Sequence, residues 1–356
     1  MRVLAIVPSQ CGTSPGQRFR IEQWAPHLSA RGIDISFEPF EDDRLHALLY
    51  APGRTASKST AIAAAFNRRL ALMRRIADFD AVYLFREAAV MGPPLLERWM
   101  QRKNVPIVFD FDDAIFESYI SPSNGRLSLL KCAGKTSTIC RLASHVMAGN
   151  PYLAEYAGRF NSRVTVVPTT IDTDVYRPMP KTTSARCVIG WTGSHSTVQH
   201  LRTIEPALRR LASTHDFTLR VIGASDYSLG GVRVEAMPWR AASEVDDLRP
   251  IDIGIMPLPD DRWSRGKCGL KALQYMALGT PAVCSPVGVN AQIIRDGENG
   301  RLASTEDEWT AQLQELIESP GLRTRLGLEA RRTVCERYSA SAQIPVVDAV
   351  FRNCVA

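Results

Sequence analysis

The feature that most constrains the fold of this sequence is a repeated alternation of short apolar runs with longer, helix-like segments. The first apolar run is Val3 to Val7, and Gln17 to Ala30 follows it with helical spacing and ends before Gly32. A second predicted strand, Ile33 to Phe37, completes a β-α-β unit. Because strands joined by crossover helices pair in parallel and are buried on both faces, the sequence predicts an α/β fold with doubly wound sheets.

The alternation stops once and then restarts, which indicates two domains. Arg177 to Arg186 contains two prolines and three small hydroxyl residues without apolar periodicity, as expected of a linker. We therefore predict one domain over 1–180 and a second over 186–335, followed by a helical segment within 336–356. The remaining predicted strands are 81–85, 107–111, 146–148, 164–167, 188–191, 218–222, 251–256 and 282–284, and the remaining predicted helices are 198–212, one starting near Ser243, and 270–278.

Composition excludes several classes of protein. The 356 residues are 45% hydrophobic and 22% charged, so the chain is neither disordered nor collagen-like. No apolar stretch approaches the roughly 20 residues of a membrane-spanning helix, and the opening residues do not resemble a signal peptide. The eight cysteines form no CxxC pair, so we expect neither a zinc site nor a disulfide framework, and the reducing cytoplasm is the expected location.

Positive charge is concentrated early in the chain, whose net charge is +6. Between Arg54 and Arg75 there are six basic residues and no acidic residue. Apolar residues recur there every three or four positions, at Ile62, Phe66, Leu70, Met73 and Ala77. The pattern predicts a basic amphipathic helix over 62–77. Such a helix either packs on its own domain or contacts an anionic surface at the inner membrane face; nucleic acid is not an expected partner, because no binding motif accompanies the charge.

The most informative segment for chemistry is 264–290, SRGKCGLKALQYMALGTPAVCSPVGVN. Gly266 and Gly269 flank Lys267 immediately before a predicted helix that begins at Leu270. A helix N-terminus offers unpaired N–H groups and the positive end of the helix dipole, and a lysine beside it adds a mobile cation. The segment is therefore either a phosphate-binding site or an ordinary capped helix.

This segment resembles the donor-binding signature of family-4 (group 1) retaining glycosyltransferases, which have the GT-B fold. Two further motifs occur in the order of that family: VTVVPTTIDTDVYRP at 164–178 resembles the end of the first GT-B domain, and VIGWTGS at 188–194 resembles the first strand and phosphate loop of the second. The resemblance implies two Rossmann-like domains facing across a cleft, with the C-terminal helix returning to the first domain. It also implies that the second domain binds a nucleotide-sugar.

The resemblance further implies a set of donor-binding residues in the second domain. Gly193 and Ser194 would offer backbone amides to phosphate, Arg265 and Lys267 would neutralise the diphosphate, and Trp239 would lie near the base after a strand. Gly269 and Leu270 begin the phosphate-binding helix, and Gln274 would hydrogen-bond a ribose hydroxyl through its amide. Most family members carry glutamates at the positions of Gly266 and Gln274, and many carry an arginine and a lysine beyond the first strand of this domain; both features are missing here.

Candidate residues of the first domain follow its predicted strands. The loop that contains Gly12 would approach the donor phosphates or an anionic acceptor, by analogy with glycine-containing loops of GT-B enzymes. Of Arg18 and Arg20, only one can face inward. Arg86 stands where many family members have a histidine that contacts the donor sugar, and His195 follows the phosphate loop of the second domain.

The sequence Val108-Phe-Asp-Phe-Asp-Asp-Ala114 places three carboxylates at a strand end. Asp110 and Asp112 have the spacing of the nucleophile and general acid of haloacid-dehalogenase phosphatases, and of the DxD motif of metal-dependent GT-A transferases. The phosphatase reading lacks a later acidic pair, and the GT-A reading requires a single domain. We therefore expect acceptor-side or sugar-binding carboxylates, with Asp112 or Asp113 assisting proton removal.

These observations together predict a glycosyltransferase that moves a sugar from a nucleotide-diphosphate donor to a glycan, lipid-linked or small-molecule acceptor. Lys267 and Arg265 would stabilise the leaving diphosphate, and the three aspartates would act as acceptor-side or sugar-binding groups. Arg86 is a further candidate catalytic residue. The resemblance implies retention of configuration, with no divalent metal and no cofactor. Two alternatives stay open: a non-catalytic sugar-nucleotide-binding or assembly protein, and a phosphatase that acts through Asp110.

Overall fold

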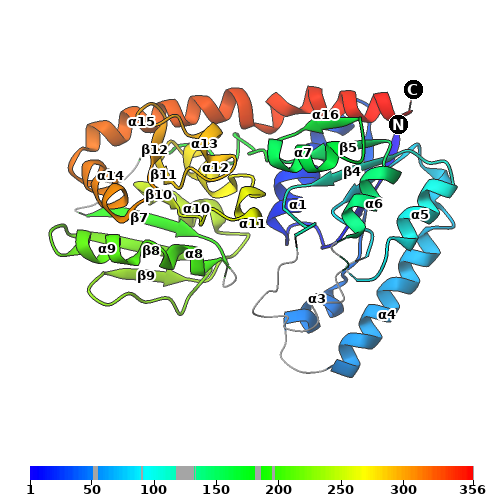
Figure 1. The fold of residues 1–356 in the computed structure, drawn as a ribbon, viewed down its shortest axis with the longest axis horizontal. Helices are drawn as coiled ribbons and strands as arrows, with labels where there is room; N and C mark the ends of the chain where they lie inside the picture. Colours follow the sequence, from blue (N-terminus) through cyan, green and yellow to red (C-terminus); the bar gives the residue numbers. More distant parts are fainter. Residues whose placement is uncertain are drawn as a thin grey trace. The chain divides into compact units, whose positions relative to one another are not determined.

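The computed structural model describes residues 1–50, 55–89, 91–117, 132, 134–180, 186–194 and 197–355 (Figure 1). It forms two compact units: unit 1 comprises Met1–Thr169 with Gln343–Ala356, and unit 2 comprises Thr170–Ala342. The first division lies earlier than the predicted linker because Ile171 and Tyr176 belong to unit 2. The Ile171 N–H donates to Tyr338 O, and Arg331 donates to the carbonyl of Tyr176.

Unit 1 contains a six-stranded parallel sheet. The strand order is β2 (Asp34–Pro39), β1 (Arg2–Val7), β3 (Ala81–Phe85), β4 (Ile107–Phe111), β5 (His145–Ala148) and β6 (Val164–Val166). Every residue of β3 and β4 is buried, as their apolar sequences predict for strands covered on both faces. The helices are α1 (Pro15–Gln17), α2 (Gln23–Ser29), α3 (Asp43–Tyr50), α4 (Thr55–Leu72), α5 (Leu95–Arg102), α6 (Lys135–Leu142) and α7 (Pro151–Gly158).

The helix predicted over 17–30 is interrupted. A π-helical turn, Arg18–Glu22, separates α1 from α2, and Phe19 and Arg20 within it leave helical backbone angles. At this kink the Arg20 side chain is fully buried and reaches Asp110 at the end of β4. The break in the helix therefore coincides with an ion pair between residues far apart in sequence. Such a break cannot be predicted from the local spacing of apolar residues.

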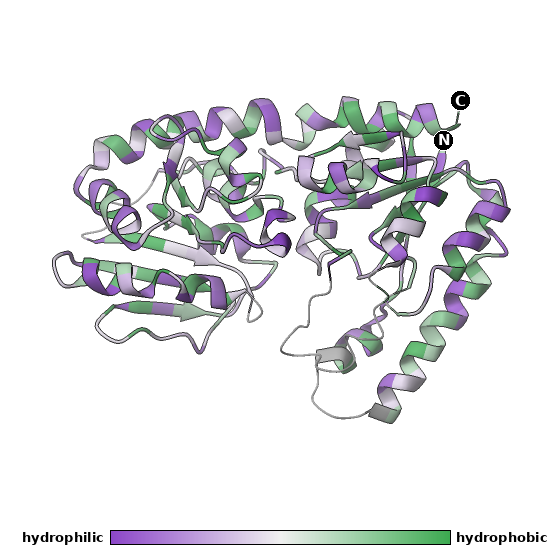
Figure 2. Cartoon of the chain, in the orientation of Figure 1, coloured by the Kyte–Doolittle hydropathy of each residue, from purple (hydrophilic) through white to green (hydrophobic). Residues whose placement is uncertain are grey.

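The buried face of α4 differs from the predicted one. Leu70 is 43% exposed, whereas Arg69 beside it is buried, so the predicted apolar stripe does not face the core along its length. The Arg69 guanidinium donates to the carbonyls of Val7 (2.8 Å), Glu38 (2.7 Å) and Ala88 (3.0 Å). Burial lowers the pKa of Arg69 to about 10. Figure 2 shows hydrophobic and hydrophilic residues interleaved along α4. Arg69 faces inward because its guanidinium binds these three carbonyls of the sheet region.

Unit 2 contains a second six-stranded parallel sheet. Its order is β12 (Gly300–Leu302), β11 (Ala282–Cys284), β10 (Ile253–Met256), β7 (Cys187–Thr192), β8 (Phe217–Ile222) and β9 (Val234–Met237). The strands β9 and β12 were not among the predicted ones. The helices of unit 2 are α8 (Val198–Arg202), α9 (Glu205–Ala212), α10 (Glu244–Leu248), α11 (Arg262–Arg265), α12 (Leu270–Ala277), α13 (Asn290–Ile293), α14 (Glu306–Glu318) and α15 (Pro320–Thr333), with a π-helical segment at Val334–Tyr338. The last helix, α16 (Ala340–Val355), begins in unit 2 and belongs to unit 1 from Gln343 onward.

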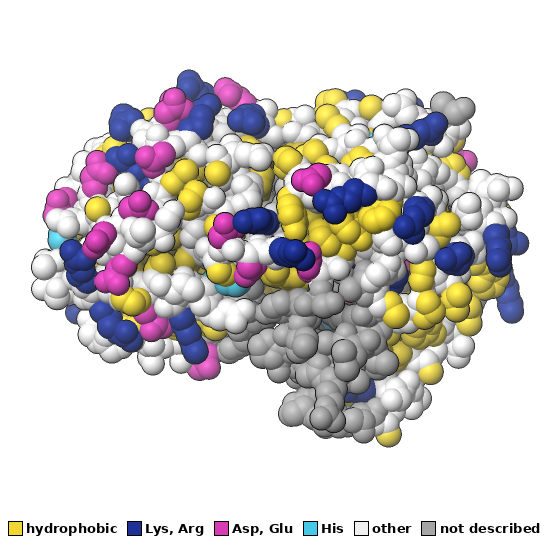
Figure 3. All heavy atoms as spheres, viewed as in Figure 1, with side chains coloured by type: hydrophobic (Ala, Val, Ile, Leu, Met, Phe, Trp, Pro, Cys, Tyr) yellow, Lys and Arg dark blue, Asp and Glu magenta, His cyan; other side chains and the backbone are white. Residues whose placement is uncertain are grey.

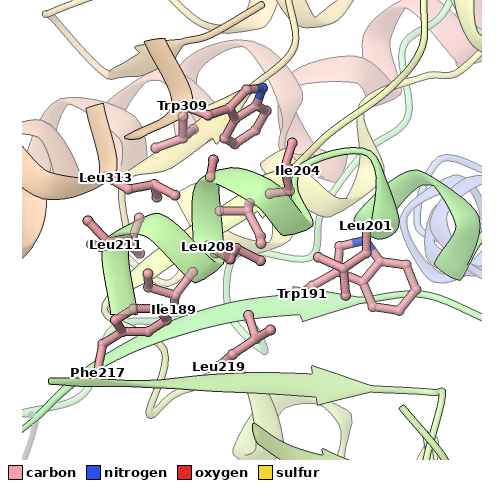
Figure 4. Packing of buried hydrophobic residues seen from close by; sticks show 14 of the residues in the cluster. Ile189, Trp191, Leu201, Ile204, Leu208, Leu211, Phe217, Leu219, Trp309 and Leu313 are labelled. Carbon is pink, nitrogen blue, oxygen red and sulfur yellow. The ribbon is translucent and has the colours of Figure 1, made fainter. Parts of the chain in front are cut away.

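The core of unit 2 fixes α9 and α14 against the sheet. Leu208 and Leu211 of α9 lie beside Phe217 and Leu219 of β8, and Trp309 of α14 packs in the same cluster (Figure 4). The predicted helix 198–212 is divided into α8 and α9 at Thr203 and Ile204, where Pro206 enters the first turn of α9. Proline has no N–H to continue the preceding helix, so the break has a local cause.

The two strand orders place a topological switch point in each unit. In unit 1 the chain runs outward from β1 to β2 and then to β3 on the other side. In unit 2 it runs from β7 to β8 and β9, and then to β10 on the other side of β7. Loops at the carboxyl ends of strands diverge at such points, where α/β proteins bind ligands. Figure 1 shows helices on both faces of each sheet, which leaves the strand ends as the accessible edges.

No helix in the described part of the chain has the length and apolar character that crossing a bilayer requires. The two doubly wound parallel sheets confirm the predicted fold class. The last segment, Gln343–Ala356, is assigned to unit 1, where Phe351 of α16 lies 6.2 Å from the ring of Tyr83.

Candidate functional site

The switch point of unit 2 is built from glycines that allow strand-end loops to touch. The Gly193 N–H after β7 donates to the Ile222 carbonyl of β8 at 2.9 Å. A Cβ at Gly223 would lie 2.0 Å from the Gly193 carbonyl oxygen, and Gly223 has φ +97°. Any other residue would force these two loops apart.

This packing changes the role predicted for the backbone after β7. The Gly193 N–H is already used by Ile222, and the Ser194 N–H donates to Thr197 Oγ1 at 3.0 Å. Neither amide is therefore available to phosphate in this conformation, which corrects the sequence interpretation of Gly193 and Ser194. Their observed role is to shape the loop. His195 lies outside the described residues.

The N-terminus of α12 has the features expected of an anion site. Gly269 is its N-cap, with φ 71°, and no side chain caps the helix. The first-turn N–H groups of a helix have no partner within the helix, so an uncapped start presents them to a ligand. Gly269 also permits close packing, because a Cβ there would lie 2.3 Å from Ile293 Cδ1. The structure thus places Gly269 and Leu270 where the sequence predicted them.

Two lysines lie beside this helix start. Lys267 Nζ is 4.8 Å from the centre of the Trp263 ring, and Lys271 Nζ is 5.7 Å from that of Trp191. Both lysines act on His200 of α8, whose side chain is buried. Burial, together with the charges of Lys271 and Lys267, lowers the pKa of His200 to about 4. Positive charge is therefore concentrated at the switch point, and His200 stays neutral at pH 7.

Lys271 was not predicted as a site residue, although the sequence contains a signal for it. Lys271 is the second residue of the helix predicted to begin at Leu270, so it lies in the first turn, beside the N–H groups that attract an anion. Arg265 differs from both lysines. It is exposed and pairs with Asp260, with 2.7 Å between Arg265 Nε and Asp260 Oδ1. Its charge is offset by that carboxylate, so the predicted catalytic role of Arg265 is weakened.

The loop after β11 packs on the same motif. A Cβ at Gly288, whose φ is +57°, would lie 2.8 Å from the Arg265 carbonyl oxygen. Asn290 is fully buried, and its Nδ2 donates to the Ser285 carbonyl at 3.2 Å. Its Oδ1 has no hydrogen-bond partner among the described residues and lies 3.5 Å from the Cβ position of Gly269. Asn290 thus adds a buried acceptor at the start of α12, which sequence reasoning missed.

Gln274 does not offer its amide to a ligand. The side chain is buried, and its Nε2 donates to Glu244 Oε1 (3.2 Å) and to the Tyr176 hydroxyl (3.3 Å). The predicted hydrogen bond from Gln274 to a ribose is therefore replaced by an internal network. Trp239, half-buried after β9, joins that network through its Nε1, which donates to Glu244 at 2.9 Å. Glu244 had no assigned role in the sequence interpretation.

At the switch point of unit 1, the loop after β1 touches an ion pair. Arg86 donates to Asp112 Oδ1 from Nε (2.8 Å) and Nη2 (2.6 Å), and it has the positive φ of 62°. A Cβ at Gly16 would lie 2.5 Å from Asp112 Oδ2 and 2.8 Å from Arg86 Nη2. Burial by itself lowers the pKa of Arg86, but Asp112 and Asp113 outweigh it and raise that pKa above its ordinary value. The pair is partly exposed, so it can meet a ligand.

Asp110 has a structural role, which corrects its prediction as a catalytic residue. Its carboxylate is fully buried, accepts from Arg20 Nε (2.7 Å) and Nη2 (2.6 Å), and accepts from the Tyr83 hydroxyl. Burial acts to lower the pKa of Arg20, but Asp110 outweighs it and keeps Arg20 charged. A fully enclosed and paired carboxylate cannot attack a phosphate ester, so the phosphatase alternative loses its nucleophile. Arg20, and not Arg18, is the arginine that faces inward.

Gly12 is also used within its own loop. Its N–H donates to Glu22 Oε2 at 2.8 Å. Asp113 is half-buried and accepts from the Ala114 N–H at 3.1 Å. Among the described residues, no three His, Cys, Asp or Glu side chains are grouped as metal ligands would be.

A separate cavity of about 450 Å³ lies at the carboxyl ends of β10, β11 and β12 in unit 2. Leu258, Ser285 and Trp309 line it, and Asp260 and Glu306 add two carboxylates. It contains none of the predicted site residues and no basic side chain in its described lining. The two carboxylates would repel a diphosphate, and the described lining offers no cation to bind it. The candidate anion site is therefore the neighbouring start of α12. The surface of unit 2 in Figure 3 mixes acidic and basic side chains, as solvated surfaces do.

Both units have the doubly wound architecture of the GT-B fold. Residues 186–319, which lie in unit 2, match the family described as glycosyl transferases group 1. This finding confirms the family predicted from the sequence.

The similar proteins support this family assignment. A D-inositol 3-phosphate glycosyltransferase of Rhodococcus jostii is 27% identical over 223 residues, which cover 54% of this chain and 48% of that protein. The alignment therefore spans about half the length of that relative. The enzyme of the same name from Acidothermus cellulolyticus is 25% identical over 89% of this chain and 81% of its own length. In fold, the chain is similar to Anabaena HepE solved in complex with UDP-glucose, with 14% identity, a TM-score of 0.67, and 99% and 100% of the two chains covered.

The buried position of Asp110 leads to a stability prediction. Asp110→Ala should lower the free energy of unfolding by about 3–5 kcal/mol, because it leaves Arg20 charged and unpaired in the core. Asp78→Ala, which removes an exposed partner of Arg75, should cost less than about 1 kcal/mol. Urea unfolding monitored by circular dichroism measures both. A stable Asp110→Ala protein would contradict the structural assignment.

His200 leads to a pH prediction. Its pKa in the folded protein, about 4, lies below its ordinary value of 6.5, so the unfolded chain binds a proton that the folded protein does not. Stability from this group is fully present above pH 6.5 and is lost as the pH falls toward 4. His200→Gln should flatten the pH dependence of the melting temperature in that window. An unchanged slope would show that other groups are responsible.

Proposed function

We propose that this protein transfers a sugar from a nucleoside-diphosphate donor, bound by unit 2, to an acceptor bound by unit 1. The observation that carries the proposal is the placement of Lys267 and Lys271 at the uncapped start of α12, close enough to lower the pKa of His200. This arrangement suits a diphosphate, which brings the negative charge that two lysines and helix N–H groups attract. The structures of HepE with UDP and with UDP-glucose support a donor of this class.

The chemical step requires stabilisation of a leaving group. As the anomeric bond breaks, positive charge develops on the sugar and negative charge on the departing diphosphate. Lys267 and Lys271 and the first-turn amides of α12 are fixed in position before the reaction, so they lower the barrier without reorganising. Trp263 and Trp191 lie under the two ammonium groups and help to hold them.

The sugar part of the donor would lie against the buried acceptor at the start of α12. Asn290 Oδ1, which has no partner among the described residues, can accept a hydroxyl hydrogen from a bound sugar. Burial of an unpaired acceptor is costly, and a ligand hydroxyl would remove that cost. This proposal adds Asn290 to the donor residues predicted from the sequence.

Acceptor binding is proposed for the Arg86–Asp112 pair of unit 1. The pair is partly exposed at the switch point, and Asp113 follows it in the chain. Arg86 stays charged and can attract an anionic acceptor, while the carboxylates of Asp112 and Asp113 can hydrogen-bond an acceptor hydroxyl. The family resemblance supports retention of configuration by front-face attack, in which a donor phosphate oxygen takes the acceptor proton and no divalent metal or further cofactor takes part.

Contact with an anionic membrane surface is a second proposal, supported by α4. Leu70 of α4 is 43% exposed, and the exposed Arg74 follows the helix. Arg68 is also exposed, although it lies on another side of the helix and pairs with Asp42 at 2.8 Å. Exposed apolar and basic side chains together favour an anionic lipid surface. This proposal concerns a lipid-linked acceptor at the inner membrane face.

The first experiment compares single lysine variants. Lys267→Ala and Lys271→Ala should each lower turnover on the order of a hundredfold, the effect of losing one preorganised charge-stabilising group. Lys103→Ala, an exposed lysine of unit 1, is the matched control and should keep full activity. The assay is release of UDP, GDP or ADP from the corresponding nucleotide-sugars in the presence of an acceptor panel.

The same experiment separates catalysis from binding alone. If thermal shifts show that UDP, GDP or ADP binds but no acceptor supports transfer, the protein is a sugar-nucleotide-binding or assembly protein. Full activity of Lys267→Ala and Lys271→Ala would contradict the proposed donor site.

The second experiment tests α4. The wild-type protein should cosediment with phosphatidylglycerol vesicles at low salt, and Leu70→Ser/Arg68→Ser/Arg74→Ser should bind about tenfold less. Arg209→Ser/Arg210→Ser, which removes two exposed arginines of unit 2, serves as the charge control. Equal binding by the two variants would exclude a specific role for α4.

A further inference from the structure

The cavity at the carboxyl ends of β10, β11 and β12 has no part in the proposed function. Leu258 follows β10, Ser285 follows β11 and Ser304 follows β12, and all three residues line it. Loops at the ends of parallel strands are where α/β proteins commonly bind ligands. The cavity volume of about 450 Å³ is within the range of about 300–1,000 Å³ that small-molecule sites have. Its position and its size therefore suit a small ligand.

Two buried hydrogen-bond donors line this cavity. Ser285 is 6% exposed; its Oγ accepts from the Leu258 N–H at 3.0 Å, and its hydroxyl hydrogen has no acceptor among the described residues. Trp309 is 2% exposed, and within the described part of the chain its indole N–H has no acceptor either. Figure 4 shows this nitrogen turned away from Leu208 and Leu211 of the apolar cluster. A buried donor without an acceptor costs free energy, so a ligand that brings acceptors into the cavity would be stabilised there.

Other polar groups of the lining can accept hydrogen bonds. Glu306, in the first turn of α14, is exposed and pairs with no cation among the described residues. Asp260 adds a second carboxylate, which Arg265 already contacts. The Thr203 hydroxyl donates to the His200 carbonyl at 2.7 Å, so its oxygen remains able to accept. A ligand that satisfies these groups must bring donors as well as acceptors, and an anion would meet two carboxylates.

We propose that this cavity is a second ligand site of unit 2, which binds an uncharged, polyhydroxylated molecule of the size of a mono- or disaccharide. A sugar hydroxyl both donates and accepts, so one ligand can accept from Ser285 and Trp309 and donate to Glu306. The buried side chains of Ile204 and Leu258 can contact the C–H groups of a sugar ring. The described lining contains no residue of the proposed donor site, so this inference goes beyond the proposed function and does not depend on it.

The first part of the test compares sugars that differ in charge. Glucose, galactose, mannose, maltose and lactose are the neutral probes, glucuronate and galacturonate are the matched anions, and glucosamine is the matched cation. In ligand-observed NMR titrations of the full chain, at least one neutral sugar should bind with a dissociation constant of about 1 mM or less. The anions should bind at least about tenfold more weakly, because Asp260 and Glu306 repel them.

The second part places the bound sugar in the cavity. Thr203→Trp puts a large side chain at an exposed position of the lining and should weaken binding of the neutral sugar at least about tenfold. Thr324→Trp is the matched control, because Thr324 is an exposed threonine of α15 whose hydroxyl also donates to a backbone carbonyl, that of Pro320. Glu306→Gln, a milder change at an exposed position, should bind the neutral sugar within about threefold of the wild type and discriminate less against glucuronate.

The outcomes that overturn the inference are distinct. If no neutral sugar of the panel binds, or if glucosamine alone binds, the cavity is not a site for an uncharged sugar. If Thr203→Trp binds the sugar as well as Thr324→Trp does, the sugar lies elsewhere on the protein. If Glu306→Gln leaves the preference for glucose over glucuronate unchanged, the carboxylate of Glu306 does not face the ligand. Failure of UDP, GDP and ADP to bind would bear on the proposed function alone.

Discussion

Positive charge held beside the start of α12 is the constraint on which the rest of unit 2 depends. Lys267 and Lys271 lie near each other, and the neutral state of His200 follows from their charges and from its burial. Like charges in a partly buried place cost free energy unless something offsets them, and the rings of Trp263 and Trp191 contribute to that offset. A bound dianion would offset far more. Placing two lysines close together lowers the free energy of unfolding of the unit, and a bound anion would restore it.

Unit 1 uses its charges in two different ways within one short segment. Asp110 is enclosed with Arg20 and Tyr83, and this network ties the kink after α1 to the end of β4. Asp112, two residues later, pairs with Arg86 at a place that solvent reaches. Enclosure converts the first carboxylate into part of the scaffold. The second remains able to exchange a protein partner for a ligand. The DFDD sequence alone does not show which aspartate is buried. Asp110 is buried because Arg20, from the segment after β1, pairs with it, whereas Asp112 stays partly exposed.

The sequence allowed accurate prediction where a local signal was sufficient. Strands 81–85, 107–111 and 282–284 have the predicted bounds, because each apolar run ends where polar or turn residues begin. The break at Pro206 also has a local cause. By contrast, the kink at Arg20 and the inward position of Arg69 depend on carboxylates and carbonyls far away in sequence. In the candidate site, the start of α12 after Gly269 could be predicted, and Lys271 could have been, from its place in the first turn of that helix. No sequence pattern shows that the amides of Gly193 and Ser194 are already used, or that Gln274 turns toward Glu244.

The position of the carboxylates in unit 2 bears on which donors it can accept. The family resemblance leads one to expect glutamates at positions 266 and 274, yet this chain has glycine and glutamine there. A buried carboxylate of this region is instead Glu244 of α10, which accepts hydrogen bonds from Tyr176, Trp239 and Gln274. With no acidic side chain at 266 or 274, the lysines at the start of α12 have less opposing charge around them. The site should then depend more on the diphosphate and less on hydroxyl contacts to carboxylates, so Asn290 becomes the main buried acceptor left for the sugar.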